Sequence, residues 1–326
     1  MAFPRRLRQG ACRALACVAA LSAVPAALAS EALPLAAADQ TCRRVADRLA
    51  SVESRWCAIP ELRASDTASV EGLPILYADL PAADPERAPR VLLFGGIHGD
   101  ELSSVSIVFG FLDELAAREA RSVHWRVVPV LNPDGLLRRP ATRGNARGVD
   151  LNRNFPSPDW QRRARAYWRR ETGSDPRRYP GAAAMSEPES RWLVAQIIAF
   201  APDVVVAMHA PLGLLDFDGH TEEAPHRLGF LDLQTLGTYP GSLGEWAGEH
   251  LGIPVVTPEL PYAGIMPTPG EIDALWRDLE AWIARRARDR GALFAGDPGV
   301  PPPAVRLTEG VRLDLPGLSL LPADTR

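Results

Sequence analysis

Short apolar runs alternate with longer amphipathic stretches along most of the chain. The short runs are rich in branched residues, which is typical of buried strands; they cover residues 73–77, 91–97, 125–131, 203–208 and 253–260. The longer stretches carry apolar residues at helical spacing, which predicts helices; they cover residues 41–54, 101–119, 186–200 and 270–290. This alternation of strands with helices predicts an α/β fold.

One long stretch interrupts this rhythm. Residues 132–178 are dominated by arginine and turn-forming residues, which indicates an irregular excursion of the kind that usually carries function. The helix that follows it has a defined start, with Ser186 as the expected N-cap and Pro188 in the first turn.

The N-terminus has the pattern of a secretory signal. Four arginines precede an apolar stretch, and Ala27-Leu28-Ala29 offers a small-residue cleavage site before Ser30. Residues 1–29 are therefore expected to be a signal peptide that directs the protein to the periplasm. The apolar stretch is too short and too often interrupted by proline to predict a stable membrane span. Behind the signal we expect three parts: an N-terminal helical segment at 30–69, the main domain at 70–295 and a proline-rich tail at 296–326.

Composition narrows the class of protein. The 326 residues are 46% hydrophobic and 23% charged, which is typical of a globular chain with a large core. The formal charge is -4, and removal of a signal that holds four arginines and no acid moves it to -4 - 4 = -8. This net negative charge argues against nucleic acid as a partner. The sequence has no lysine, which excludes both a Schiff-base mechanism and a Walker-type phosphate loop.

Two cysteines remain once the signal is removed. Cys42 and Cys57 are 57 - 42 = 15 residues apart, and export to an oxidising compartment favours a disulfide between them. Such a loop contributes about 3 kcal/mol in the chain-entropy description. The alternative is a pair of unpaired buried thiols.

Polar side chains stand at the ends of the predicted strands. In open α/β sheets, ligands bind outside the carboxyl ends of the strands, so these residues are expected to meet at one rim; they are His98, Glu101, Asn132, His209 and Glu259. Two histidines and a carboxylate form a catalytic zinc set, which leaves a fourth position for water. The H-x-x-E pair alone is a weak signal, because a histidine at a strand end is often a surface hydrogen-bonding group.

The segment 143–155, RGNARGVDLNRNF, adds a second motif. With it, residues 70–290 resemble the zinc metallocarboxypeptidase family. The resemblance implies a single α/β domain with a central mixed, mostly parallel sheet flanked by helices. It also implies one zinc ion per chain, held by His98, Glu101 and His209, with Glu259 as general base.

The same resemblance assigns substrate contacts. Asn152 and Arg153 match the pair that grips the terminal carboxylate of a peptide, and Arg143 matches the arginine that polarises the scissile carbonyl. The chemistry agrees, because a guanidinium can hold a carboxylate through two parallel hydrogen bonds and stabilise an oxyanion. Taken singly, these arginines are also compatible with surface charges, Asn152 with a turn residue and Glu259 with a solvated strand end.

One family feature is displaced. Digestive members carry a mobile tyrosine about twenty-two residues before the base, but position 259 - 22 = 237 is glycine here. Tyr239 stands two residues away and is our candidate for a substrate contact in its place.

Within the family, the segments 209–219 (HAPLGLLDFDG) and 241–246 (GSLGEW) are most similar to murein peptide amidases. That resemblance implies cleavage of the γ-D-glutamyl-diaminopimelate bond in a small wall peptide with a free carboxylate. Asp216 or Asp218 is a candidate contact for the substrate amine, although both also suit loop or capping positions. Three alternatives remain open: a general periplasmic metallocarboxypeptidase, an aspartoacylase-type deacylase, and a wall-peptide binding module without activity.

Overall fold

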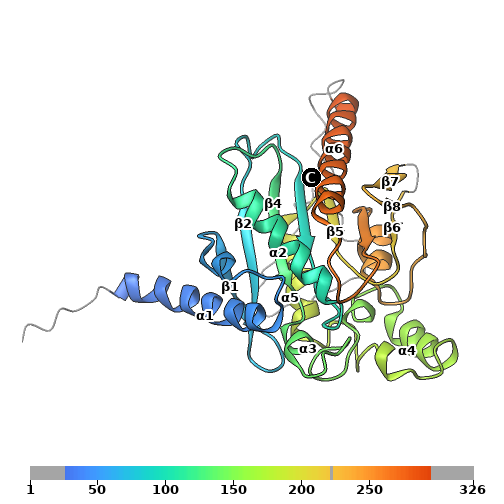
Figure 1. Ribbon diagram of the computed structural model, residues 1–326. Helices are drawn as coiled ribbons and strands as arrows, with labels where there is room; N and C mark the ends of the chain where they lie inside the picture. Colours follow the sequence, from blue (N-terminus) through green and yellow to red (C-terminus); the bar gives the residue numbers. More distant parts are fainter. Residues whose placement is uncertain (1–25, 221–222, 295–326) are drawn as a thin grey trace, which may run out of the picture.

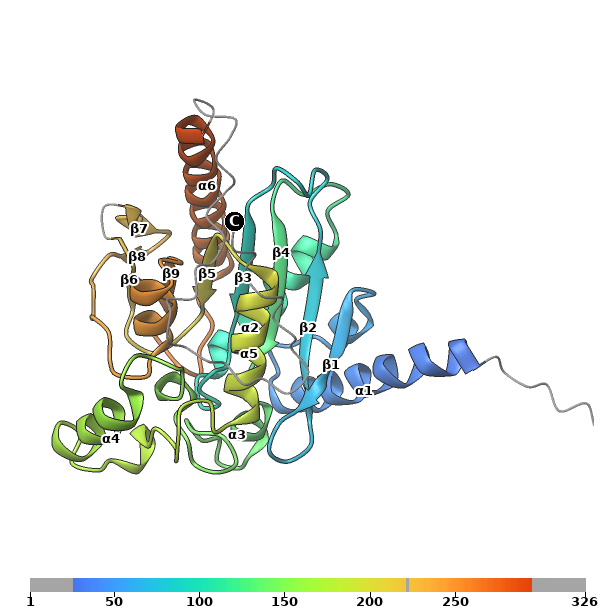
Figure 2. The ribbon, with the colours of Figure 1, turned by 180° about the vertical axis from the view of Figure 1, so that it is seen from behind.

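A central sheet with helices on both faces forms the body of the protein (Figures 1 and 2). The computed structural model describes residues 26–220 and 223–294. Its strands are β1 (Leu62–Ala68), β2 (Pro74–Leu80), β3 (Arg90–Phe94), β4 (His124–Val130), β5 (Val204–Ala207), β6 (Leu214–Asp218), β7 (Arg227–Leu228), β8 (Leu231–Asp232) and β9 (Val255–Glu259). Its α-helices are α1 (Ala26–Arg48), α2 (Leu102–Ala116), α3 (Pro133–Leu137), α4 (Trp160–Arg170), α5 (Pro188–Phe200) and α6 (Pro269–Phe294). Short helical segments are η1 (Ser54–Ala58), η2 (Leu151–Arg153), η3 (Pro176–Arg178) and the π-helical η5 (Gly244–His250).

The main sheet has seven strands in the order β1-β2-β4-β3-β5-β9-β6. The four central strands β4, β3, β5 and β9 are parallel to one another, whereas β2 and β6 run in the opposite direction. The predicted mixed, mostly parallel sheet is thus confirmed. Its parallel centre brings the carboxyl ends of β3, β5 and β9 to one edge, which is where the candidate site residues follow their strands.

Alternate residues of the central strands enter two separate cores. Val91 and Leu93 of β3 face a core that includes apolar residues of α1, α2 and α6. Leu92 and Phe94 face the opposite core, to which α5 and η5 contribute. Because both faces are covered, β3 is apolar from Val91 to Phe94, as expected for a parallel strand in the middle of such a sheet.

The sequence predicted the buried elements better than the exposed ones. Each predicted strand is present with ends shifted by no more than three residues, and the helices at 101–119, 186–200 and 270–290 correspond to α2, α5 and α6. The sequence did not predict β1, β6 or α4. The expected helix at 41–54 is the end of a longer helix, α1, which stops at Arg48. Ser186 as N-cap is wrong, because Glu187 occupies that position and the Ser186 hydroxyl donates to the Glu187 carboxylate instead.

Parts of the expected termini lie outside the described residues. These are residues 1–25 of the predicted signal and the tail at 296–326. The proposed cleavage site Ala27-Leu28-Ala29 falls within the first turn of α1. Among the described helices, none combines the length and the apolar character that a membrane crossing requires.

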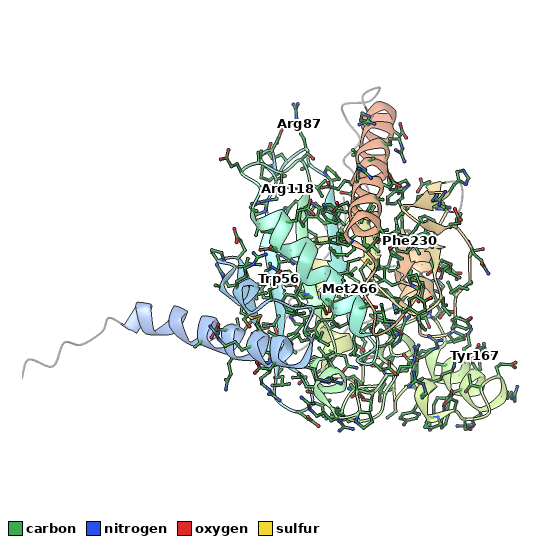
Figure 3. All side chains as sticks on the ribbon, viewed as in Figure 1. Trp56, Arg87, Arg118, Tyr167, Phe230 and Met266 are labelled. Atoms are coloured by element: carbon green, nitrogen blue, oxygen red, sulfur yellow. A yellow bond between two sulfur atoms is a disulfide. The ribbon has the colours of Figure 1, made fainter. Side chains whose placement is uncertain are left out.

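A disulfide joins Cys42 of α1 to Cys57 of η1, with the two Cα atoms 5.5 Å apart. Next to it lies Trp56 (Figure 3). Its ring stacks on Phe109 of α2 at a centroid distance of 6.4 Å. The bridge therefore ties the N-terminal helix to the core beside α2. Both cysteines are buried, as either reading of the sequence required.

We expect Cys57→Ser to lower the free energy of unfolding by about 3 kcal/mol, because the bridge restricts a loop of about 15 residues in the unfolded chain. Urea unfolding measures this change, and peptide mapping without reduction should recover the linked pair. The double variant that also removes Cys42 should lose no more than the single variant. Two freely alkylated thiols in protein purified under oxidising conditions would contradict the pairing.

Candidate active site

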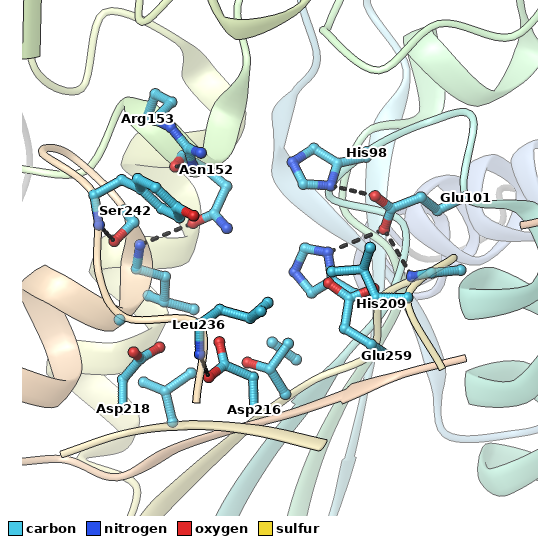
Figure 4. A pocket seen from close by; sticks show the side chains of 18 of the residues that line it. His98, Glu101, Asn152, Arg153, His209, Asp216, Asp218, Leu236, Ser242 and Glu259 are labelled. Carbon is cyan, nitrogen blue, oxygen red and sulfur yellow. Dashed lines mark hydrogen bonds and ion pairs between the residues drawn. The ribbon is translucent and has the colours of Figure 1, made fainter. Parts of the chain in front are cut away.

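Three potential metal ligands meet at the carboxyl edge of the sheet. His98 lies in the loop between β3 and α2, Glu101 is the N-cap of α2, and His209 follows β5 (Figure 4). One nitrogen of each histidine and one oxygen of Glu101 lie within 4.8 Å of one another, and all three residues are buried. The sequence prediction that these three side chains come together is confirmed.

Backbone contacts fix the loop that carries the first two ligands. A Cβ atom on Gly99 would overlap the backbone of Gly135 at the start of α3, so only glycine allows this approach. The Asn132 side chain accepts from the Gly135 N–H and donates to the carbonyls of Ile97 and Arg143. Asn132 was expected at the rim with the ligands, but it holds the two loops together from behind and does not line the cavity.

Glu101 lies between the two imidazoles. Its Oε1 is 2.7 Å from Nδ1 of His98, and its Oε2 is 3.0 Å from Nδ1 of His209. Burial alone would raise the pKa of Glu101, but the two histidines outweigh burial and hold that pKa below its ordinary value. Burial likewise opposes the raised pKa of His209, which results from Glu101. Two imidazole nitrogens and one carboxylate oxygen this close together are the donor set of a catalytic zinc site, so these residues fit the ion.

Asp150 is a functional residue that the sequence analysis missed. It is fully buried, and its Oδ1 lies 3.1 Å from Nε2 of His98, on the opposite side of the ring from Glu101. A carboxylate in this position orients a histidine ligand and fixes its tautomer. Burial favours the neutral acid, but Arg143 and His98 hold the pKa of Asp150 well below its ordinary value. Asp150 lies in the RGNARGVDLNRNF motif between Arg143 and Asn152, and this position was the available signal in the sequence.

Arg143 is tied to the metal-ligand cluster through two carboxylates. Its Nε donates to Asp150 over 3.0 Å, and its NH1 group reaches Glu101 Oε1 at 3.4 Å. The side chain retains 18% exposure and lines the cavity. The guanidinium is therefore held beside the ligands with one side facing the space that a substrate would fill.

Glu259 is at the end of β9 and faces the same space. The side chain is buried, and its Oε2 has no hydrogen-bond partner among the described residues. Burial is the main cause that raises the pKa of Glu259, and His209 opposes it. A buried carboxylate with raised pKa and a free oxygen is suited to proton transfer.

Asn152 and Arg153 lie on the wall across the cavity from the ligands (Figure 4). Asn152 Oδ1 accepts from the Leu243 N–H at 2.9 Å. Arg153 is 5% exposed, and its guanidinium carbon lies 4.5 Å from the centre of the Tyr239 ring. All predicted site residues except Asn132 therefore line one cavity of about 270 Å³, which also includes Arg178 and Ser242, two residues that the sequence did not single out.

Comparison with known proteins identifies relatives of this arrangement. A zinc carboxypeptidase (Peptidase_M14) family model matches residues 58–211. Murein peptide amidase A of Vibrio campbellii is 32% identical over 228 residues, which are 68% of this chain and 86% of that protein. Murein peptide amidase A of Escherichia coli K12 is 35% identical over 200 residues, or 59% of this chain and 78% of that protein. The crystal structure of carboxypeptidase A from Helicoverpa armigera shares the fold, with a TM-score of 0.53 at 18% identity over 75% of this chain and 72% of that chain.

These relatives confirm the expected fold, the expected enzyme class and the expected zinc cofactor. The alternative of a binding module without activity is not supported, because the relatives named above are enzymes. The chain belongs to the zinc carboxypeptidase family, whose members are hydrolases that use a zinc ion.

Proposed function

We propose that this enzyme cleaves the γ-D-glutamyl-diaminopimelate bond of murein peptides and so releases the C-terminal diamino acid. The observation that carries the proposal is a buried guanidinium that forms no ion pair among the described residues, across a small cavity from the metal ligands. That guanidinium belongs to Arg153. In addition, the relatives with 32% and 35% identity are named murein peptide amidases.

Arg153 has the surroundings of a carboxylate-binding residue. Within the described part of the chain it forms no ion pair, and its Nε has no hydrogen-bond partner. Its NH1 group donates to the Asn152 carbonyl at 2.6 Å, and burial lowers its pKa. A buried cation without a partner is unfavourable in free energy. A terminal carboxylate would offset this by accepting two parallel hydrogen bonds from the guanidinium. Asn152, next in the chain, adds an amide that can donate to the same carboxylate.

The remaining residues supply the chemistry of amide hydrolysis. Zinc, held by His98, Glu101 and His209, would lower the pKa of water and polarise the scissile carbonyl. Glu259 takes the proton of the attacking water and later gives it to the leaving amine. Arg143, fixed by Asp150, places a positive charge where the carbonyl oxygen becomes negative. Tyr239 covers the Arg153 guanidinium and is the proposed substrate contact on that wall.

Two observations support a wall peptide as the substrate and export as the route to it. The segments 209–219 and 241–246, through which the sequence resembles murein amidases, both contribute residues to the cavity wall. The arginine-rich, apolar N-terminus and the Cys42–Cys57 bridge suit a periplasmic protein. The enzyme would act there on small wall peptides, with no nucleic acid as partner.

The terminal carboxylate should be essential for efficient cleavage. We expect release of free diaminopimelate from L-alanyl-γ-D-glutamyl-diaminopimelate. Amidation of the diaminopimelate carboxylate next to the scissile amide should lower kcat/KM by about 10–100-fold. Arg153→Lys should cause a similar loss, because a point charge cannot reproduce two parallel hydrogen bonds. Mass spectrometry of the products and initial rates measure both effects.

Arg162→Lys is the matched control, because the Arg162 side chain is 79% exposed and lies on α4 outside the cavity. Its kcat/KM should equal that of the unchanged enzyme. Faster cleavage of ordinary peptides that end in leucine or arginine would instead support a general carboxypeptidase. Cleavage of acylated amino acids in preference to peptides would support the deacylase reading.

A further inference from the structure

One face of α4 contacts the cavity wall that carries Arg153. The helix lies away from the sheet (Figures 1 and 2), and its side chains at positions 160, 163 and 167 share one face because of their helical spacing. Trp160 Nε1 donates to the Arg153 carbonyl at 2.8 Å. One turn and a half further along, the Tyr167 ring contacts the Tyr239 ring at a centroid distance of 5.7 Å. The mechanism proposed above gives this helix no role.

The segment 239–245 lies between α4 and the proposed carboxylate-binding pair, Asn152 and Arg153. At its start, the Tyr239 ring covers the Arg153 guanidinium at 4.5 Å. Further along, the Leu243 N–H donates to Asn152 Oδ1 at 2.9 Å. Asn152 and Arg153 lie together on one wall of the cavity (Figure 4). The segment thus contacts both side chains that are proposed to bind the substrate carboxylate.

Gly241 is the point at which this segment meets the backbone of Arg153. Its φ is +83°, and a Cβ atom at this position would overlap the Arg153 carbonyl and lie 2.5 Å from Trp160 Nε1. Only glycine therefore allows the approach. The Gly241 carbonyl also accepts from the Phe155 N–H at 3.0 Å. A displacement of Gly241 would consequently be transmitted to the chain on both sides of Arg153.

Glu245 ties Gly241 to α4. Its Oε2 accepts from the Gly241 N–H at 2.8 Å, and its Oε1 lies 2.5 Å from the Arg163 NH1 group. The Ser157 hydroxyl oxygen accepts from the same Gly241 N–H at 2.9 Å. The Glu245 side chain is 3% exposed, and a carboxylate this deeply buried needs hydrogen bonds and a cation. Within the described part of the chain, Arg163 is the cation that pairs with it.

We propose that the Glu245–Arg163 ion pair positions the segment 239–245. Through this segment it holds Arg153 and Tyr239 in the orientation that binds a terminal carboxylate. Both members of the pair are positioning residues, because neither lines the cavity. The inference rests on the carboxylate-binding role of Arg153 in the proposed function, but not on which amino acid the peptide ends in.

The test measures the preference of the enzyme for a free terminal carboxylate. It compares kcat/KM for L-alanyl-γ-D-glutamyl-diaminopimelate with that for the same tripeptide amidated at the carboxylate next to the scissile amide. We expect an acid-to-amide ratio of about 10–100 in the unchanged enzyme. A second pair of peptides, ending in leucine and in leucinamide, measures the same preference without the diamino acid.

Glu245→Gln should lower the acid-to-amide ratio by at least about 5-fold, because misplacement of a substrate-binding group is costly to the reaction. Glutamine has one acceptor oxygen, so it can serve the Gly241 N–H or the Arg163 guanidinium but not both, and its NH2 group would face the other donor. The loss should fall on the KM of the acid peptide, with kcat changed less than about 3-fold, since Glu245 lies outside the cavity that holds the metal ligands. A variant that is only less stable would lose activity on both peptides and keep the ratio.

Arg163 offers variants that do not disturb a buried position, because its side chain is 42% exposed. Arg163→Gln should lower the ratio in the same direction as Glu245→Gln. Arg163→Lys should keep at least about half of the ratio, since a lysine ammonium can pair with one carboxylate oxygen as the NH1 group does. The double variant Arg163→Gln/Glu245→Gln should lose little more than Glu245→Gln alone, because both changes remove one contact.

Arg162→Gln and Glu171→Gln are the matched controls. Arg162 is next to Arg163 on α4, but its side chain is 79% exposed and pairs with Asp159. Glu171 is exposed at the C-cap of the same helix. Neither residue lines the cavity, so both variants should keep the ratio of the unchanged enzyme.

An unaltered acid-to-amide ratio in both Glu245→Gln and Arg163→Gln would overturn the inference, provided that the unchanged enzyme prefers the acid. An equal loss of the ratio in Arg162→Gln would overturn it as well, because the effect would then belong to the charge of α4 and not to the ion pair. A ratio near one in the unchanged enzyme would contradict the proposed role of Arg153 itself, and this inference with it.

Discussion

Glu259→Gln should lower kcat by about 10²–10⁴-fold while the protein still binds one zinc per chain. Glutamine has nearly the same shape, but its amide cannot accept and return a proton. Glu259 is buried at the end of β9 with one carboxylate oxygen unpartnered among the described residues, and it lies outside the cluster of three ligands. Its removal should therefore impair proton transfer and leave metal binding intact.

Initial rates on the diaminopimelate tripeptide and elemental analysis of the same preparation test this prediction. Glu114→Gln is the matched control, since the Glu114 side chain on α2 is 48% exposed and pairs with Arg118 far from the cavity. Loss of zinc together with activity would show that Glu259 is a ligand. Full activity in Glu259→Gln would show that the base is another residue.

The sequence predicts the central fold because its strands are buried on both sides. In β3, Val91 to Phe94 are all fully buried, so the strand appears as an uninterrupted apolar run. In β1, by contrast, Leu62 alone is buried, because this edge strand packs only partly against the core. The run in β6 is interrupted by Asp216, whose burial depends on the cavity and not on the core. Strands at the sheet edge or along the cavity are therefore missed by a prediction that is based on hydrophobicity.

The sequence pattern does not predict α4 for a similar reason, because most of this helix is exposed. Only Trp160 and Ala164 of its eleven residues are buried, and arginines cover much of the remaining surface. The resulting stretch looks like a polar loop in the sequence. The Ser186 error has a different origin: serine is a preferred N-cap residue, but the helix begins one residue later, after Glu187, whose side chain forms no cap hydrogen bond. Only the backbone decides between the two positions.

The site is predictable where a motif fixes both residue type and spacing. His98 and Glu101 are three residues apart, and Asn152 and Arg153 are adjacent, so each pair carries its own signal. Asp150 also stands in the RGNARGVDLNRNF motif, but the role of this buried aspartate is recognised only through its contacts with His98 and Arg143. That Arg153 forms no ion pair within the described part of the chain is also a property of packing. Sequence alone therefore gives the metal ligands and the Asn152–Arg153 pair but not the contacts that hold them in place.

His209→Ala should remove both the metal and the activity. His209 is 4% exposed and supplies one of the two imidazoles in the cluster, so its loss leaves a single nitrogen and one carboxylate. Changes to groups behind a metal ligand weaken binding by about 10–100-fold, and loss of the ligand itself should exceed that range. Glu101 would also lose the imidazole 3.0 Å from its Oε2, which now helps to keep it ionised.

Elemental analysis after dialysis against a weak chelator measures zinc directly and does not depend on turnover. The control is His226→Ala, because His226 is exposed near β7 and does not line the cavity. That variant should keep one zinc per chain and full activity, whereas His209→Ala should keep neither. If His209→Ala retains stoichiometric zinc, the third ligand lies elsewhere. If the unchanged enzyme is fully active without metal, hydrolysis depends on Glu259 and the arginines alone, and the assignment of all three ligands is wrong.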